Sequence, residues 1–263
     1  MKDFFFETSP YQWNRPGNPS IYATTPMCVD KLFAELKKHD KYSEKDILAF
    51  VTYSLVKVTK SFPRINSYFF MKKRVTRKGI KLSFMVKSDN PESSLFIQPI
   101  DFTEDITIGS LRKKIYTKIE KVRQDPLYSV RFSSNLMRLT PGIFRNIFFS
   151  FFYFLSKQKL FKFIHKACPH DLFGSVIISY VGSLGLPSAY IPLLKHGTNS
   201  MILAVGKVEK KLEFDENKNV IEKKYLQLSW TIDHRLTHGE ELSRYYKAIK
   251  KIFDNPELFF KKD

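Results

Sequence analysis

Near its C-terminus the chain joins a strand pattern directly to a helix pattern, and this pair constrains the fold more than any other feature. Apolar and polar residues alternate over 225–232, which predicts a strand with one buried face. Over 239–253 apolar residues recur at helical spacing, which predicts an amphipathic helix. His234 stands at the corner between the two. A histidine held there is rigid and accessible, which suits a general base, although a loop histidine with a surface or capping role fits the same pattern.

Helix and strand patterns also alternate through the rest of the chain. Ser43 and Asp46 form a capping-box-like start to a helix that begins near Ile47 and is closed by Pro63. Strands interleaved with packing helices predict an α/β fold, in which a mixed β-sheet is flanked by helices. Further helices are predicted over 30–38 and 107–123, and strands over 66–71, 81–86, 95–100, 174–180, 200–205 and 208–214.

Several segments resemble those of one known family. Asp233-His234-Arg235 is followed after three residues by Gly239, and Ser179 lies in a strand pattern that leads into a Gly-rich turn. Near the N-terminus, Gln12-Trp13-Asn14-Arg15 is similar to the opening motif of chloramphenicol acetyltransferases. In this order the segments resemble the chloramphenicol acetyltransferase-like superfamily, and within it the catalytic domain of dihydrolipoamide acyltransferases, the 2-oxo acid dehydrogenase acyltransferase component. The resemblance runs over residues 172–258 and, more weakly, 10–125.

The resemblance implies both a fold and a mechanism. His234 matches the histidine that takes a proton from a thiol or hydroxyl, which then attacks an acyl thioester. Ser179 matches the serine that donates a hydrogen bond to the oxyanion, with Ser183 as the fallback. Coenzyme A or acyl-CoA would be a substrate, with no tightly bound cofactor and no metal. The family builds trimers with active sites between subunits, so a homotrimer is expected.

One position departs from the family pattern. The motif has an acid where this chain has His238, and in the relatives that acid supports the site by pairing with an arginine. Arg15 matches that arginine. A neutral imidazole cannot give Arg15 the carboxylate that a bidentate pair requires. Either another acid takes over, with Asp233 the nearest in sequence, or the site is arranged differently.

The matched segments predict one acyltransferase-like catalytic domain over 1–263. The unmatched middle, about 130–170, is predicted to be a helical, aromatic-rich insertion. Because the first motif begins at Gln12, we expect no lipoyl domain and no peripheral-subunit-binding domain, and hence a stand-alone form. Within the insertion, 143–164 is densely aromatic but too short to cross a bilayer, which takes about 20 residues. It fits a packing element, an interfacial membrane helix or a wall of an acyl-chain pocket.

The cysteines indicate a reducing compartment. Cys28 and Cys168 are too few for a disulfide framework and lack metal-ligand spacing. Neither lies in a recognisable nucleophile turn, which disfavours cysteine catalysis. Together with the missing signal-peptide pattern, they predict a cytoplasmic protein, peripheral to the membrane if 143–164 binds lipid.

The formal net charge is +18, and it is unevenly distributed. Residues 57–81 and 126–170 contain many Lys and Arg and no Asp or Glu. This fits a lysine-rich surface, a field that attracts the anionic phosphates of coenzyme A, or nucleic-acid binding. No helix-turn-helix, zinc finger or RNA-binding motif supports the third interpretation.

The leading hypothesis is therefore a coenzyme A-dependent acyltransferase that acts on a small-molecule or lipid-like thiol or alcohol. Two alternatives remain: a catalytically impaired scaffold or assembly relative, suggested by His238, and a basic protein of the membrane surface.

Overall fold

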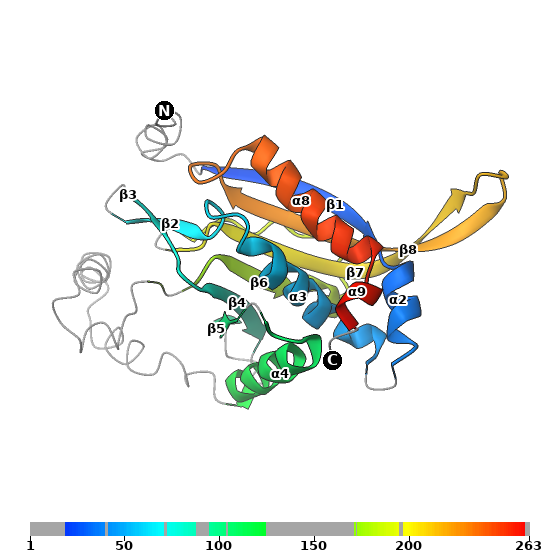
Figure 1. Ribbon diagram of the computed structural model, residues 1–263, viewed down its shortest axis with the longest axis horizontal. Coiled ribbons are helices and arrows are strands. Elements are labelled where there is room, and N and C mark those ends of the chain that lie inside the picture. The colour runs from blue at the N-terminus through cyan, green and yellow to red at the C-terminus, as the bar shows by residue number, and fades with distance from the viewer. Residues whose placement is uncertain are drawn as a thin grey trace.

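A mixed six-stranded sheet forms the centre of the molecule (Figure 1). Its strand order is β1-β8-β7-β6-β4-β5. The pairs β4–β6 and β6–β7 are parallel, and the other neighbours are antiparallel, so the predicted mixed sheet is confirmed. The strands are β1 (Ser20–Cys28), β4 (Ile80–Lys87), β5 (Leu95–Phe102), β6 (Val176–Tyr180), β7 (Met201–Phe214) and β8 (Val220–Asp233).

The computed structural model describes residues 19–39, 42–70, 73–87, 95–103, 105–124, 171, 173–194 and 197–260. Three of the predictions fall outside these residues. They concern the supporting role of Arg15, the aromatic-rich insertion over 130–170, and Cys168.

Both edge strands carry a proline. Pro26 lies in β1 and Pro99 in β5, the two ends of the strand order. Proline has no N–H to donate to a ladder, so it is tolerated at an edge and it discourages further pairing there. The sequence patterns did not predict β1, because Pro26 interrupts a segment that has no regular alternation.

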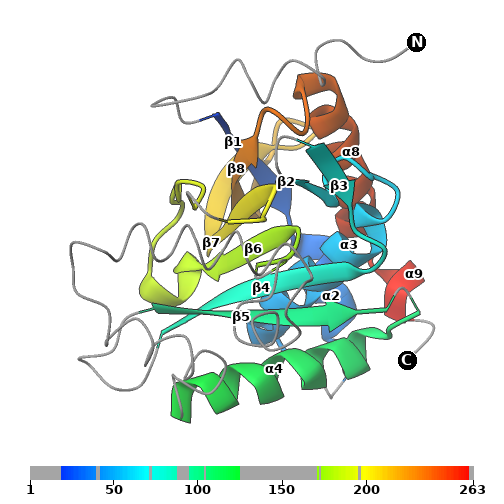
Figure 2. The same ribbon diagram turned by 90° about the vertical axis from the view of Figure 1, so that its left-hand side faces the viewer.

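The helices lie against the sheet (Figures 1 and 2), and the side chains that they bury are mostly apolar. Helices α3 and α8 contact each other, and α4 packs against α3, β4 and β5. Tyr245 of α8 is fully buried against Trp230 of β8, and its hydroxyl hydrogen-bonds with Thr59 of α3 at 2.9 Å. The helices are α2 (Asp30–Leu36), α3 (Ile47–Thr59), α4 (Ile108–Gln124), α8 (Gly239–Asp254) and α9 (Glu257–Phe260), with short 3-10 turns η1 (Glu44–Asp46) and η2 (Val181–Leu184).

The start of α3 and the whole of α8 follow the predicted patterns. The Ser43 N–H donates to Asp46 Oδ2 at 2.9 Å, as a capping box requires. In α8, Tyr245, Ile249 and Phe253 face the core. These contacts fix the direction in which α8 leaves the end of β8.

A second, two-stranded sheet stands beside the main one. It pairs β2 (Ser67–Phe70) with β3 (Lys73–Thr76), and only the first of these was predicted. The basic sequence of β3 has no apolar alternation. Its structure therefore depends on pairing with β2 rather than on burial of its own side chains.

The outer parts of β7 and β8 form a two-stranded ribbon that projects from the body (Figure 1). β7 was predicted as two strands, and it is one strand with an irregular register between Val205 and Val208. β6 pairs only as far as Val205, and β1 only as far as Tyr225. Beyond those points the ribbon has no further partner strand among the described residues.

We find no helix within the described part of the chain that is long and apolar enough to cross a membrane.

Candidate active site

His234 lies immediately after β8, at the corner that the sequence predicts. Its backbone N–H donates to the carbonyl of Pro19 at 2.8 Å, and its Nδ1 lies 3.0 Å from the carbonyl oxygen of Thr237. A carbonyl oxygen only accepts, so in this contact Nδ1 carries the proton. A neutral imidazole then has its lone pair on Nε2. This is the tautomer that a general base needs if Nε2 faces the substrate.

Asp233 forms an ion pair within its own loop. The carboxylate is buried and accepts from the Arg235 side chain, with Nη2 at 2.6 Å and Nε at 2.9 Å. Burial would lower the pKa of Arg235, but the hydrogen bond and the charge of Asp233 raise it above its usual value. The pairing of Asp233 with Arg15 stays a prediction, because Arg15 lies outside the described residues.

His238 caps helix α8. Its backbone is extended, and its Nδ1 accepts from the N–H of Glu241 at 3.4 Å. This is the position and the bond of an N-cap side chain. His238 Nε2 lies 3.5 Å from Nη1 of Arg64, which also lies 3.5 Å from Oε2 of Glu241.

Ser179 is half-buried near the end of β6, just before η2. The fallback residue, Ser183, is exposed and donates to the carbonyl of Tyr180 at 2.7 Å, a bond within its own turn. Two glycines shape this turn. Gly185 has φ of +81°, which favours glycine, and a Cβ on Gly182 would lie 2.4 Å from the carbonyl oxygen of Gly206.

The register separates Ser179 from His234 within one chain. Ser179 pairs with Ala204 of β7, which pairs with Ser229 of β8. From position 229 to position 234 the chain advances about 16 Å along the strand, and two strand spacings add about 10 Å across the sheet. Figure 2 shows β6, β7 and β8 in this succession. Groups that act on the same reacting atoms must lie within about 3 Å of them. One copy of the chain does not bring these two residues together.

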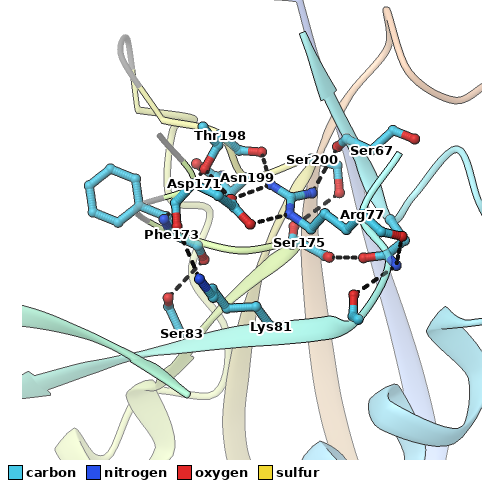
Figure 3. A network of polar contacts seen from close by, with 12 residues as sticks. Ser67, Arg77, Lys81, Ser83, Asp171, Phe173, Ser175, Thr198, Asn199 and Ser200 are labelled. Atoms are coloured by element: carbon cyan, nitrogen blue, oxygen red, sulfur yellow. Dashed lines mark hydrogen bonds and ion pairs between the residues drawn. The ribbon is translucent and has the colours of Figure 1, made fainter. Parts of the chain in front are cut away.

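A largely buried polar network braces the segments that lead into β6 and β7 (Figure 3). Arg77 donates to both carboxylate oxygens of Asp171 at 2.8 Å, and to the carbonyl of Thr198 at 2.7 Å. Burial would raise the pKa of Asp171, but the Arg77 guanidinium and the Thr198 hydroxyl hold it below its usual value. The Ser200 carbonyl, next in the network, accepts from the N–H of Asp233 at 2.8 Å.

Cys28 does not have the environment of a nucleophile. Burial raises the pKa of its thiol, and the thiol lies 3.4 Å from the carboxylate of Asp30. Both effects lower the fraction of thiolate, which is the reactive form. Within the described ranges, no group of three or more His, Cys, Asp or Glu is placed to hold a metal ion.

The groups that contact the His234 loop from outside the motif were not predicted from the sequence. Arg64 follows a helix pattern, and Glu241 looks like an ordinary acid in the first turn of a helix. The spacing from His238 to Glu241 equals that of a capping box, and this signal points to Glu241. No pattern in the sequence around Arg64 indicates that this residue contacts Glu241.

Comparisons with known proteins bear on this geometry. Residues 165–261 match the family model of the 2-oxoacid dehydrogenases acyltransferase (catalytic domain). The lipoamide acyltransferase component of the branched-chain alpha-keto acid dehydrogenase complex, mitochondrial, from Caenorhabditis elegans is 30% identical over 83 residues. That alignment covers 32% of this chain and only 18% of the relative.

Solved structures extend the likeness to the whole sheet. A dihydrolipoamide acetyltransferase from Azotobacter vinelandii gives a TM-score of 0.64 at 16% identity, covering 98% of this chain and 88% of that one. A chloramphenicol acetyltransferase gives 0.55 at 14% identity, covering 94% of both chains. The chain has a chloramphenicol acetyltransferase-like fold. The resemblance inferred from the sequence is thus confirmed. The residues that match the family model include Ser179, His234 and His238.

Proposed function

We propose that this chain is an acyltransferase that moves an acyl group from coenzyme A to a thiol or hydroxyl acceptor. The observation that carries the proposal is the bond between His234 Nδ1 and the Thr237 carbonyl, inside the segment that matches the acyltransferase catalytic domain. It holds the imidazole in the tautomer with the lone pair on Nε2. In the Azotobacter vinelandii relative, a serine, a histidine and an asparagine four positions after the histidine have been studied for their catalytic roles. His234 and His238 have the same spacing.

The reaction follows from these groups. His234 Nε2 takes the proton of the acceptor as the acceptor's sulfur or oxygen attacks the thioester carbonyl carbon. Ser179 Oγ donates a hydrogen bond to the resulting oxyanion. When the intermediate collapses, the carbon–sulfur bond to coenzyme A breaks, and the imidazolium returns its proton to the leaving thiolate. Acyl transfer is then complete, and His234 is neutral again.

The separation of Ser179 from His234 supports a site shared between copies of the chain. We propose that His234 of one copy faces Ser179 of another, in a homotrimer. The excess of positive charge would attract the phosphates of coenzyme A.

A thiol-release assay with a panel of acyl-CoA donors tests the proposal. We expect turnover by the wild type and its loss in His234→Ala, while Ser179→Ala slows turnover by about 10²- to 10³-fold, the usual effect of removing one oxyanion donor. Unchanged turnover in His234→Ala would contradict the mechanism. Stable trimers that turn over no donor would favour the scaffold alternative. Retention on anionic vesicles that salt abolishes would favour the membrane-surface alternative.

A further inference from the structure

The loop that carries His234 is fastened by a buried carboxylate outside the sequence motif. Thr237, whose carbonyl accepts from His234 Nδ1, donates its hydroxyl to Glu241 Oε2 at 3.2 Å. Both Thr237 and Glu241 are buried. The acceptor that selects the tautomer of His234 is therefore held from both sides, by the backbone of the loop and by the first turn of α8.

Glu241 is in turn paired with Arg64. Nη1 of Arg64 lies 3.5 Å from Oε2 of Glu241, and the arginine comes from the turn between α3 and β2. A buried carboxylate without a cation would be costly. The pair thus connects the His234 loop to a segment that is distant in the sequence.

His238 lies beside the same arginine but brings no carboxylate to it. Its Nδ1 accepts from the backbone N–H of Glu241, so in the neutral ring Nε2 bears the proton. Nε2 and Arg64 Nη1, which lie 3.5 Å apart, are then both donors, and no hydrogen bond joins them. The acid that the resemblance places at position 238 is absent, and the carboxylate that faces the arginine comes from position 241.

We propose that Glu241, together with Arg64, is the positioning pair for the base in this chain, in place of an arginine paired with an acid at position 238. The inference rests on the proposed function of His234. Glu241 acts through Thr237: it fixes the carbonyl that keeps the proton on Nδ1 and so keeps Nε2 available to the acceptor.

Glu241→Gln removes the charge that pairs with Arg64 but leaves an oxygen for the Thr237 hydroxyl. We expect kcat to fall by about 10- to 100-fold, as for other residues that orient a functional histidine, while KM for the acyl donor stays within about twofold. Glu240→Gln is the matched control. It removes the same charge from the same turn, but Glu240 is exposed, and its ion pair among the described residues is with the exposed Arg244, at 3.8 Å.

A second variant tests the geometry directly. His238→Asp places a carboxylate opposite Arg64, so adding it to Glu241→Gln should restore most of the lost kcat. Equal kcat in Glu241→Gln and Glu240→Gln would overturn the proposal, and so would a failure of His238→Asp to restore activity.

A readout independent of turnover separates this proposal from the proposed function. In ¹⁵N-histidine-labelled protein, we expect the His234 ring to be protonated at Nδ1 in the wild type and in Glu240→Ala, and to show mixed tautomers in Glu241→Ala. The His234→Ala spectrum assigns the signal. A wild type that turns over no donor refutes the proposed function, yet the tautomer shift would still establish the positioning role. An unchanged tautomer in Glu241→Ala would refute that role whatever the turnover.

Discussion

At the scale of single residues, His238 lacks the carboxylate of the family motif but still caps a helix. Asp and Asn are among the best N-cap residues, because their side chains accept from the first free N–H groups of a helix. His238 Nδ1 does the same for the N–H of Glu241. The replacement that removes the motif's carboxylate therefore preserves the start of α8.

The cap gives the first prediction. His238→Ala should lower the free energy of unfolding by about 1 kcal/mol, the usual effect of removing an N-cap side chain, whereas His238→Asn should not lower it. Urea unfolding at pH 7.5 measures both. Equal losses in the two variants would mean that His238 stabilises the protein through something other than the cap.

Asp171 gives the second prediction, on pH dependence. Although burial alone would raise its pKa, Arg77 and Thr198 hold that pKa below the ordinary value of 3.8. The carboxylate therefore stabilises the folded state fully above pH 3.8, and this contribution is lost as the pH falls from 3.8 through the lowered folded value. Above pH 3.8, Asp171→Asn should be less stable than the wild type by about 3 to 5 kcal/mol, because the substitution leaves Arg77 buried without its carboxylate partner.

As the pH falls below 3.8, the stability of the wild type should decline toward that of Asp171→Asn. Urea unfolding between pH 2 and pH 7 tests this. A stability difference that stays constant across the range would show that the pair does not titrate as proposed.

At the scale of elements, a loop crossing explains the break in β7. The Lys207 N–H donates to the carbonyl of Leu186 at 3.0 Å, so the segment after η2 passes directly over β7 at this point. A Cβ on Gly206 would lie 1.8 Å from the carbonyl oxygen of Pro187. Only glycine lets the two backbones approach this closely.

Gly206→Ala is the third prediction. We expect a loss of about 1 to 3 kcal/mol, the range for forced overpacking, because backbone atoms rather than a flexible side chain must move. Gly239→Ala is the control: nothing lies within 4 Å of the added Cβ, and alanine favours helix, so its stability should equal or exceed that of the wild type. Thermal unfolding compares them. An equal melting temperature for Gly206→Ala and the wild type would contradict the crossing.

Elements with a strong local signal could be predicted from the sequence. The alternation before His234 and the helical spacing after Gly239 predicted β8 and α8, and with them the corner of the candidate site. β1 could not be predicted, because Pro26 hides it and its place depends on pairing with β8. β8 also begins at Val220, before the alternation becomes regular.

The long-range contacts that support the site could not be predicted from the sequence. Arg77 and Asp171 are separated by 94 positions, and Arg64 and Glu241 meet only once α3, β2 and α8 have packed. Each of these residues is an ordinary charged residue in its own sequence context. The family resemblance pointed to the histidine and the serine. Asp233 was the candidate replacement acid because it is the nearest in sequence, and in the structure it pairs with Arg235.

At the scale of the whole molecule, the distance between Ser179 and His234 means that the proposed catalysis requires more than one copy of the chain. The fourth prediction follows. His234→Ala and Ser179→Ala, mixed and allowed to exchange subunits, should recover up to about a quarter of wild-type activity, the share of sites that random assembly completes. Turnover before and after exchange measures this. No recovery between subunits shown to exchange would contradict a site that is shared between copies.

The ribbon of β7 and β8 also determines where the chain can accept added sequence. Its turn is held by Asp215, which accepts from the N–H groups of Asn217 and Asn219 at 2.8 Å, and it lies about 20 Å along the strand beyond Val208. A fluorescent protein spliced into this turn would sit clear of the sheet and of the His234 loop. If the chain is divided at this turn, one fragment keeps β7 and the other keeps β8, and pairing of these two strands can bring the fragments together. The turn of this ribbon is therefore the position that we would choose for a label or for dividing the chain.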